Sequence, residues 1–259
     1  FCGYHGWHDW YISTNLNREN NLNKHLLKGI KTKGVPKILK NSVFPFEYNN
    51  IRQLERLLKK NIKIIFMEVK RNIEPSNNFL KKVRNLASKF NAILIFDECT
   101  SGFRETFGGL HLKYKVFPDI VIFGKALGNG YAISAILGKK KVMKFSQSSF
   151  ISSTFWTERI GPTAALKTLE IMGNQKTWIK ISDTGRYLKN KIKIIAKNHN
   201  IPLKISGLES HIIFNFNCKH HNLIKTYLTQ EMLKKGYLCS NVIFVSISHK
   251  KKLVNKYLD

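Results

Sequence analysis

The chain has 259 residues, of which 43% are hydrophobic and only 6 are proline, so it can bury one large core and a smaller one beside it. Its formal net charge of +28 makes it a strongly basic protein, and such a charge would favour binding to a nucleic acid or to an anionic membrane surface. No apolar run is long enough to span a bilayer, and the four cysteines lack the spacing of a disulfide scaffold. We therefore expect a soluble, cytoplasmic protein with reduced thiols.

Helical and strand patterns alternate along the chain, as they do in α/β domains. Their order over residues 51–97 predicts a parallel crossover unit, and we place a boundary near residue 173 between a large domain, 1–173, and a smaller α+β domain, 174–259. Apolar spacing predicts helices over 51–60, 79–90, 162–172, 178–198 and 221–235. Short β-branched runs predict strands over 62–69, 92–97, 119–123, 201–206, 211–216 and 242–248.

Two of these apolar runs have charged residues at their carboxyl ends. The first ends in Asp97 and Glu98, and the second is followed by Lys125 within a glycine-rich turn. Such runs are typical of buried parallel strands, and open α/β sheets bind ligands beyond the carboxyl ends of their strands. A carboxylate and an amine at one sheet edge match the needs of pyridoxal phosphate, whose aldehyde requires a lysine and whose ring nitrogen requires an acid.

Four segments of the chain stand out, two of them around these residues: GYHGWHD at 3–9, LIFDECTSGFR at 94–104, PDIVIFGKALGNGY at 118–131 and SSTFWTERIG at 152–161. Together they resemble the class III (fold type I) pyridoxal-phosphate aminotransferases, and within them the glutamate-1-semialdehyde aminomutase branch. The resemblance implies an α/β fold, in which helices flank a mostly parallel sheet in the large domain and a smaller α+β domain follows.

Lys125 and Asp97 are the residues that we expect to carry the chemistry. Lys125 is expected to bind the cofactor as a Schiff base, because desolvation beside a cationic ring favours the neutral, nucleophilic amine. The alternative interpretation is that Lys125 is an ordinary surface lysine in a turn. Asp97 is expected to hold the protonated ring nitrogen, since a carboxylate at the end of an apolar strand needs a cation or a proton donor. The alternative is a helix cap or a pair with Arg104, and Glu98 is expected to be a structural or subunit-contact acid.

The resemblance implies roles for four further residues. Tyr4 corresponds to the aromatic residue that stacks on the cofactor ring, with His5 beside it. Thr154 corresponds to a threonine that donates to the cofactor phosphate of the neighbouring subunit, which implies a homodimer. Glu68 corresponds to a glutamate at a strand end on the substrate side of the ring.

Other site types fit the sequence less well. Cys218, His220 and His221 have no fourth ligand at a zinc-like spacing, so we expect no metal. The glycines near Lys125 are a poor match to a dinucleotide fingerprint, because no acidic residue ends a following strand at the required spacing. The lysines are scattered and no nucleic-acid-binding motif accompanies them, so we expect neither a specific nucleic acid nor a membrane as partner.

The resemblance implies an enzyme that transfers an amino group with pyridoxal 5′-phosphate, acting on a small amino or keto substrate or within one substrate as an aminomutase. Members of the family have a longer amino-terminal part with a phosphate-binding loop, so we expect the chain to be a fragment that lacks this part. The alternative is a catalytically inactive, truncated transferase that acts as a basic binding protein.

Overall fold

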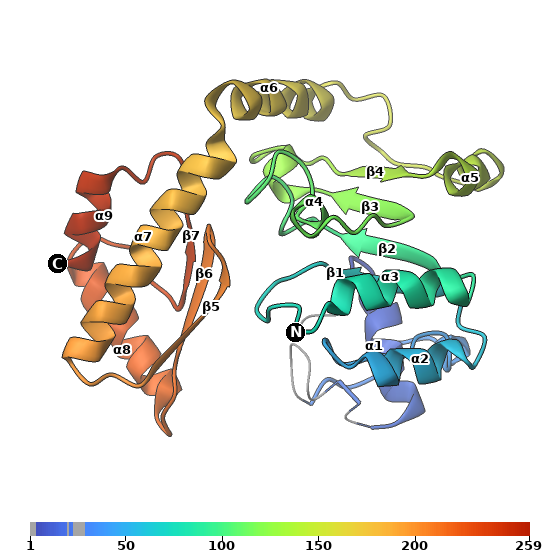
Figure 1. Ribbon diagram of the computed structural model, residues 1–259, viewed down its shortest axis with the longest axis horizontal. Coiled ribbons are helices and arrows are strands. Elements are labelled where there is room, and N and C mark those ends of the chain that lie inside the picture. The colour runs from blue at the N-terminus through green and yellow to red at the C-terminus, as the bar shows by residue number, and fades with distance from the viewer. Residues whose placement is uncertain (1–3, 20, 23–28) are drawn as a thin grey trace. The chain divides into compact units, whose positions relative to one another are not determined.

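The computed structural model describes residues 4–19, 21–22 and 29–259, so expectations that concern Cys2 and Gly3 lie outside the described residues. Contacts divide the chain into two compact units, which Figure 1 shows as ribbons. Unit 1 comprises Phe1–Glu98, Tyr114–Phe123 and Ala135–Ser153. Unit 2 comprises Cys99–Lys113, Gly124–Ser134 and Thr154–Asp259.

Unit 1 is built on a four-stranded sheet in the order β1-β2-β3-β4. The first three strands are parallel and β4 is antiparallel, so the predicted parallel crossover from β1 to β2 is confirmed. The register pairs Glu68 with Asp97, which places these two acids side by side at the carboxyl ends of β1 and β2. The strands are β1 (Ile64–Glu68), β2 (Ile93–Asp97), β3 (Ile120–Phe123) and β4 (Ala135–Gly138).

The helices of unit 1 follow the predicted apolar stripes. In α3 the side chains of Leu80, Val83 and Ala87 are buried on one face, and the helix packs on β2. The predicted helices at 51–60 and 79–90 are confirmed with ends one or two residues shorter. The helical segments are α1 (His8–Asn17), η1 (Lys37–Leu39), α2 (Ile51–Leu58), α3 (Phe79–Lys89), α5 (Lys140–Met143) and η3 (Lys144–Ser148), with α4 (His111–Tyr114) at a boundary between the units.

Helix α1 has no counterpart among the predicted elements, because it buries polar residues and shows no apolar stripe. Ser13, Thr14 and Asn15 are all buried. The Asn15 side chain accepts a hydrogen bond from the Leu22 backbone N–H at 3.0 Å and donates to the Ile30 carbonyl at 2.9 Å. Hydrogen bonds to distant backbone groups, which a search for apolar periodicity does not detect, therefore hold this helix in place.

Unit 2 contains an antiparallel sheet in the order β5-β6-β7, and Figure 1 shows its helices α7, α8 and α9 on one side of this sheet. Its core includes Ile181, Leu188, Ile212, Val245 and Val254. The elements are η2 (Lys125–Leu127), α6 (Ile160–Gln175), α7 (Thr177–Asn198), β5 (Leu203–Leu208), β6 (His211–Phe216), α8 (His221–Lys234), β7 (Val242–Phe244) and α9 (Lys251–Leu258).

The predicted strand at 242–248 is shorter in the structure. The backbone N–H of Ser246 donates to Nδ1 of His249 at 3.0 Å, and this turn takes the chain out of the sheet after Phe244.

The expected division into domains at residue 173 stays a prediction. Helices α6 and α7 break nearby, at Lys176, whereas the two units defined by contacts divide the chain elsewhere. Within the described ranges, no helix has the length and apolarity to cross a membrane.

Asp119 connects several elements of unit 1. Its carboxylate is 6% exposed and accepts a hydrogen bond from the Leu94 backbone N–H at 2.9 Å. It also pairs with Arg84 and with Lys139, each at 2.7 Å. Burial raises the pKa of Asp119, but the hydrogen bonds from the Leu94 N–H, Lys139 and Arg84 outweigh burial and lower the pKa to about 2. The start of β3 is thereby held to β2, to α3 and to the residue that follows β4.

We expect Asp119→Asn to lower the free energy of unfolding by about 2 kcal/mol at pH 7, the value that corresponds to the lowered pKa. Because the folded pKa lies below that of the unfolded chain, the contribution is complete above about pH 4 and is lost as the pH falls toward the folded value. Urea unfolding of both proteins at pH 7 and below pH 3 measures this. A difference between them that stays constant over this pH range would contradict the role of Asp119.

Candidate functional site

Lys125 lies in unit 2 at the start of η2, two residues after β3 ends. Its φ of +44° lies in the left-handed region, which is strained for a residue with a side chain. The side chain is exposed, and Nζ donates a hydrogen bond to Oγ1 of Thr100 at 3.1 Å. Strained residues are common at functional sites, so this backbone geometry agrees with the role expected for Lys125.

The glycine after η2 is required by the turn itself. A Cβ atom on Gly128 would lie 2.2 Å from the carbonyl oxygen of Tyr131 and 2.7 Å from the side chain of Ile133. The chain can therefore fold back beside Lys125 only with glycine at this position. At Gly128 the close approach to the backbone is made by the protein's own chain.

A cavity of about 500 Å³ lies in unit 2, and Lys125 is one of its lining residues. Arg104 lines it as well: its Nε donates to the Thr100 carbonyl at 2.6 Å, and its guanidinium lies 5.4 Å from the centre of the Phe244 ring. Burial lowers the pKa of Arg104. The cavity thus brings two basic side chains to one wall, and its volume is in the range of small-molecule sites.

Asp97 and His5 meet in unit 1. Nδ1 of His5 lies 2.8 Å from Oδ2 of Asp97, and both side chains are almost buried. The His5 ring stacks on Phe66, with the ring centres 4.0 Å apart and the planes 12° from parallel. His5 is therefore fixed by a stack on one of its faces and by a carboxylate at its edge, and it holds the Asp97 side chain in turn.

The other predicted site residues have less specific surroundings. Glu68 is buried at the end of β1 and pairs with Arg71 at 3.2 Å. Tyr4 is exposed and meets the Tyr11 ring edge-on at 6.2 Å. Thr154 is exposed and its side chain forms no hydrogen bond with a residue that the structure describes. The roles expected for these residues stay predictions.

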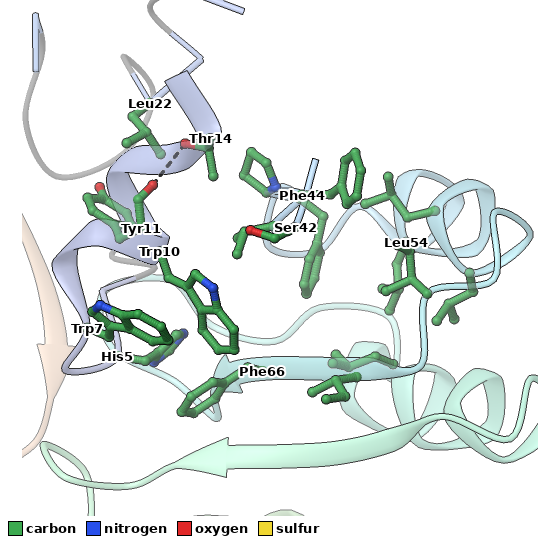
Figure 2. A pocket seen from close by; sticks show the side chains of 18 residues that line it. His5, Trp7, Trp10, Tyr11, Thr14, Leu22, Ser42, Phe44, Leu54 and Phe66 are labelled. Atoms are coloured by element: carbon green, nitrogen blue, oxygen red, sulfur yellow. Dashed lines mark hydrogen bonds between the residues drawn. The ribbon is translucent and has the colours of Figure 1, made fainter. Parts of the chain in front are cut away.

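A second cavity, of about 240 Å³, lies in unit 1 and is shown in Figure 2. His5 and Phe66 line it, and Trp7 stacks on Trp10 with ring centres 4.5 Å apart. Its walls are mostly aromatic and aliphatic, and none of the described residues that line it carries an amine, so these residues suit apolar groups. Elsewhere, no cluster of three or more His, Cys, Asp and Glu side chains among the described residues is arranged to hold a metal ion.

Sequence reasoning gave no site role to Thr100 or Phe244, and it considered Arg104 only as an alternative partner of Asp97. Thr100 and Arg104 follow Asp97 within the segment 94–104, and their position just past a strand end was a signal that could have found them. Phe244 is 140 residues farther along the chain than Arg104, and no sequence pattern connects the two.

Comparison with known proteins gives a family model, described as Aminotransferase class-III, that matches residues 12–249. The chain is 33% identical over 215 residues to the 3-aminobutyryl-CoA aminotransferase of Cloacimonas acidaminovorans (strain Evry), a match that covers 79% of this chain and 48% of that protein. It is 30% identical over 284 residues to the glutamate-1-semialdehyde 2,1-aminomutase of Wigglesworthia glossinidia brevipalpis, covering 99% of this chain and 64% of that protein. The chain thus spans less than two thirds of the length of these relatives.

Two solved structures are similar to the chain as well. The PLP internal aldimine form of the FumI protein from Sphingopyxis sp. MTA144 superposes with a TM-score of 0.82 and 21% identity, covering 96% of this chain and 66% of that one. An omega-transaminase from Sphaerobacter thermophilus gives a TM-score of 0.81 and 19% identity, covering 99% and 64%. At this level of identity the likeness concerns the fold, and it confirms the fold type I arrangement expected from the sequence.

Proposed function

Because the chain belongs to the class III aminotransferase family, we propose that it serves in amino-group transfer with pyridoxal 5′-phosphate. The reaction is transfer between a small amino and a small keto substrate or, as in an aminomutase, transfer within one substrate. The observation that carries this proposal is the amine of Lys125, which is exposed, backbone-strained and open to a cavity of about 500 Å³. A lysine that binds a carbonyl group needs an accessible amine and room for the bound molecule.

The residues present fit the cofactor on two counts. An exposed amine in a roomy cavity can bind an aldehyde carbon, and Lys125 supplies it. A carboxylate fixed by a neighbour can accept a hydrogen bond from a protonated ring nitrogen, and Asp97, held by His5, supplies that. In the same proposal Tyr4 stacks on the ring and Glu68 lies on its substrate side.

The site residues named above then have defined roles in the reaction. Once bound, the cofactor supplies an electron sink for the negative charge left on the substrate when a proton is removed. Nζ of Lys125 takes that proton from the α-carbon and returns one during the reaction. Thr100 holds the amine at the cavity wall by accepting its hydrogen bond, and His5 keeps the Asp97 carboxylate oriented.

The first test concerns Lys125. We add one equivalent of pyridoxal phosphate and then borohydride, which reduces an imine to a stable amine. We expect a single adduct in the wild-type chain, because the proposal assigns the imine with the cofactor aldehyde to Lys125 alone. Lys125→Ala should lose it, while Lys180→Ala, which removes an exposed lysine of α7, should keep it. Peptide mass mapping locates the label. A label spread evenly over surface lysines in the wild type and in Lys125→Ala alike would contradict the proposal.

The second test concerns Asp97. We expect Asp97→Asn to keep the adduct at Lys125 but to slow exchange of the α-proton of amino acids by more than 100-fold, about 3 kcal/mol, the scale for losing a buried electrostatic partner. Nuclear magnetic resonance in heavy water, with alanine and glutamate as probes, measures the exchange. The exposed Asp183→Asn serves as the charge-matched control. A rate for Asp97→Asn within threefold of the wild type would leave Glu98 as the next candidate.

We further propose that the chain forms a homodimer through the segment 145–160. Six large apolar side chains in this segment are exposed, and such side chains are typical of an interface. Thr154 lies in the middle of the segment, where a partner copy would place it against the partner's cofactor phosphate. The six side chains are Phe145, Phe150, Ile151, Phe155, Trp156 and Ile160.

Sedimentation velocity tests the dimer. Phe150 is 97% exposed, so Phe150→Asp should leave the fold intact and produce monomers by placing a charge in the interface. Leu238→Asp, at a site 91% exposed outside the segment, should stay dimeric. Thr154→Ala should keep the dimer and weaken cofactor binding. A wild-type chain that is monomeric at all concentrations, or a Phe150→Asp variant that remains dimeric, would contradict this part of the proposal.

A further inference from the structure

The cavity of unit 1 is formed by several elements of the chain and has a volume of about 240 Å³. Figure 2 shows one side chain from each of these elements around the same space: Trp10 of α1, Phe44 of the loop before α2, Leu54 of α2 and Phe66 of β1. An apolar cavity of about 150 Å³ is enough to bind benzene. The cavity of unit 1 therefore has room for one aromatic ring or for two fused rings.

Part of the cavity lining is aliphatic and buried, and part is aromatic and open to water. Leu22, Leu58 and Ile65 line the cavity and are 2% exposed or less. Trp7 and Trp10 line it as well, and they are 50% and 42% exposed. A small molecule can therefore enter beside the two indole rings, and its apolar surface would leave water against the aliphatic side chains.

His5 adds a hydrogen-bond acceptor to this lining. A carboxylate only accepts hydrogen bonds, so Nδ1 of His5 donates to Oδ2 of Asp97, and Nε2 of the neutral ring carries a lone pair. The His5 side chain is 12% exposed, and its Nε2 forms no hydrogen bond with a residue that the structure describes. By contrast, the hydroxyls of Thr14 and Ser42 donate to backbone carbonyls at 3.0 and 2.6 Å. An acceptor among apolar side chains gains from a ligand that brings a donor.

We propose that this cavity binds a small planar aromatic molecule that carries one N–H or O–H group, and that this group donates to Nε2 of His5. Indoles and phenols belong to this class. The ring of the ligand packs against the aromatic and aliphatic walls, where contacts between rings add to the burial of apolar surface.

The acceptor has a fixed direction that such a ligand can recognise. The His5 ring stacks on Phe66 with the ring centres 4.0 Å apart, and Asp97 holds its other nitrogen at 2.8 Å. Two contacts at different parts of the ring prevent it from turning, so the lone pair of Nε2 stays in place. None of these contacts involves Lys125, so the inference does not depend on the proposed function.

Calorimetric titration without cofactor tests the site with two probes, indole and benzofuran. The two molecules have nearly the same shape, but only indole has an N–H donor. We expect the wild type to bind indole about tenfold more tightly, because benzofuran leaves Nε2 without a donor in an apolar site. His5→Phe keeps an aromatic ring at this position but removes the acceptor, so its affinities for the two probes should be nearly equal. His199→Phe, at an exposed histidine of unit 2, should keep the full ratio.

Ser42→Trp tests the cavity without a change at His5. Ser42 is exposed and lines the cavity, so a large side chain at this position should fill part of the space and leave the fold intact. We expect the affinity for both probes to fall by about tenfold or more. Ser248→Trp, at an exposed serine of unit 2, should bind both probes as the wild type does.

Three results would overturn the proposal: an indole dissociation constant above about 1 mM in the wild type, equal affinities of the wild type for both probes, and unchanged indole binding in Ser42→Trp. Thermal unfolding shows whether each variant is folded. A folded His5→Phe variant that still prefers indole would also overturn the proposal. If His5→Phe does not fold, the decision rests on the other two proteins: a tenfold preference in the wild type and its loss with both probes in a folded Ser42→Trp support the site.

Discussion

The parallel pairing of β1, β2 and β3 is the constraint on which the rest of unit 1 depends. Parallel strands need a crossover between them, and α3 supplies it for β1 and β2. Asp119 fixes where β3 begins, through the Leu94 backbone and two basic side chains. With that register set, Glu68 and Asp97 have to leave the sheet at the same edge.

The chemistry that we propose depends on the segments that follow the strands. The segment after β2 contains Thr100 and Arg104, and the one after β3 contains Lys125. The strained backbone of Lys125 is offset by the tight turn at Gly128 and by the hydrogen bond to Thr100. Functional residues often lie on loops and turns, and the rigid strands that these loops connect keep the side chains in place.

Charge acts at two levels in this protein. The net charge of +28 attracts anions of every kind and is screened by salt at distances beyond about 10 Å. A partly buried guanidinium without a counter-ion in its own unit is screened much less and selects by geometry as well as by sign. The guanidinium of Arg104 is of this second kind.

The sequence by itself determined most of the helices and strands, because apolar periodicity and β-branched runs are properties of consecutive residues. It also indicated the fold, and it singled out Lys125 and Asp97, whose assigned roles stay predictions. Helix α1 and strand β4 were not predicted. The helix buries polar side chains, and the strand lies antiparallel at the edge of the sheet, where its residues are largely exposed.

Only the tertiary structure decided which distant residues meet. His5 contacts Asp97, which is 92 positions away in the chain, and the guanidinium of Arg104 lies over the ring of Phe244. The pairing of Glu105 with Lys113 depends on how the loop after β2 folds back. Such contacts result from the packing of whole elements, and each contributes too little energy to leave a local pattern in the sequence.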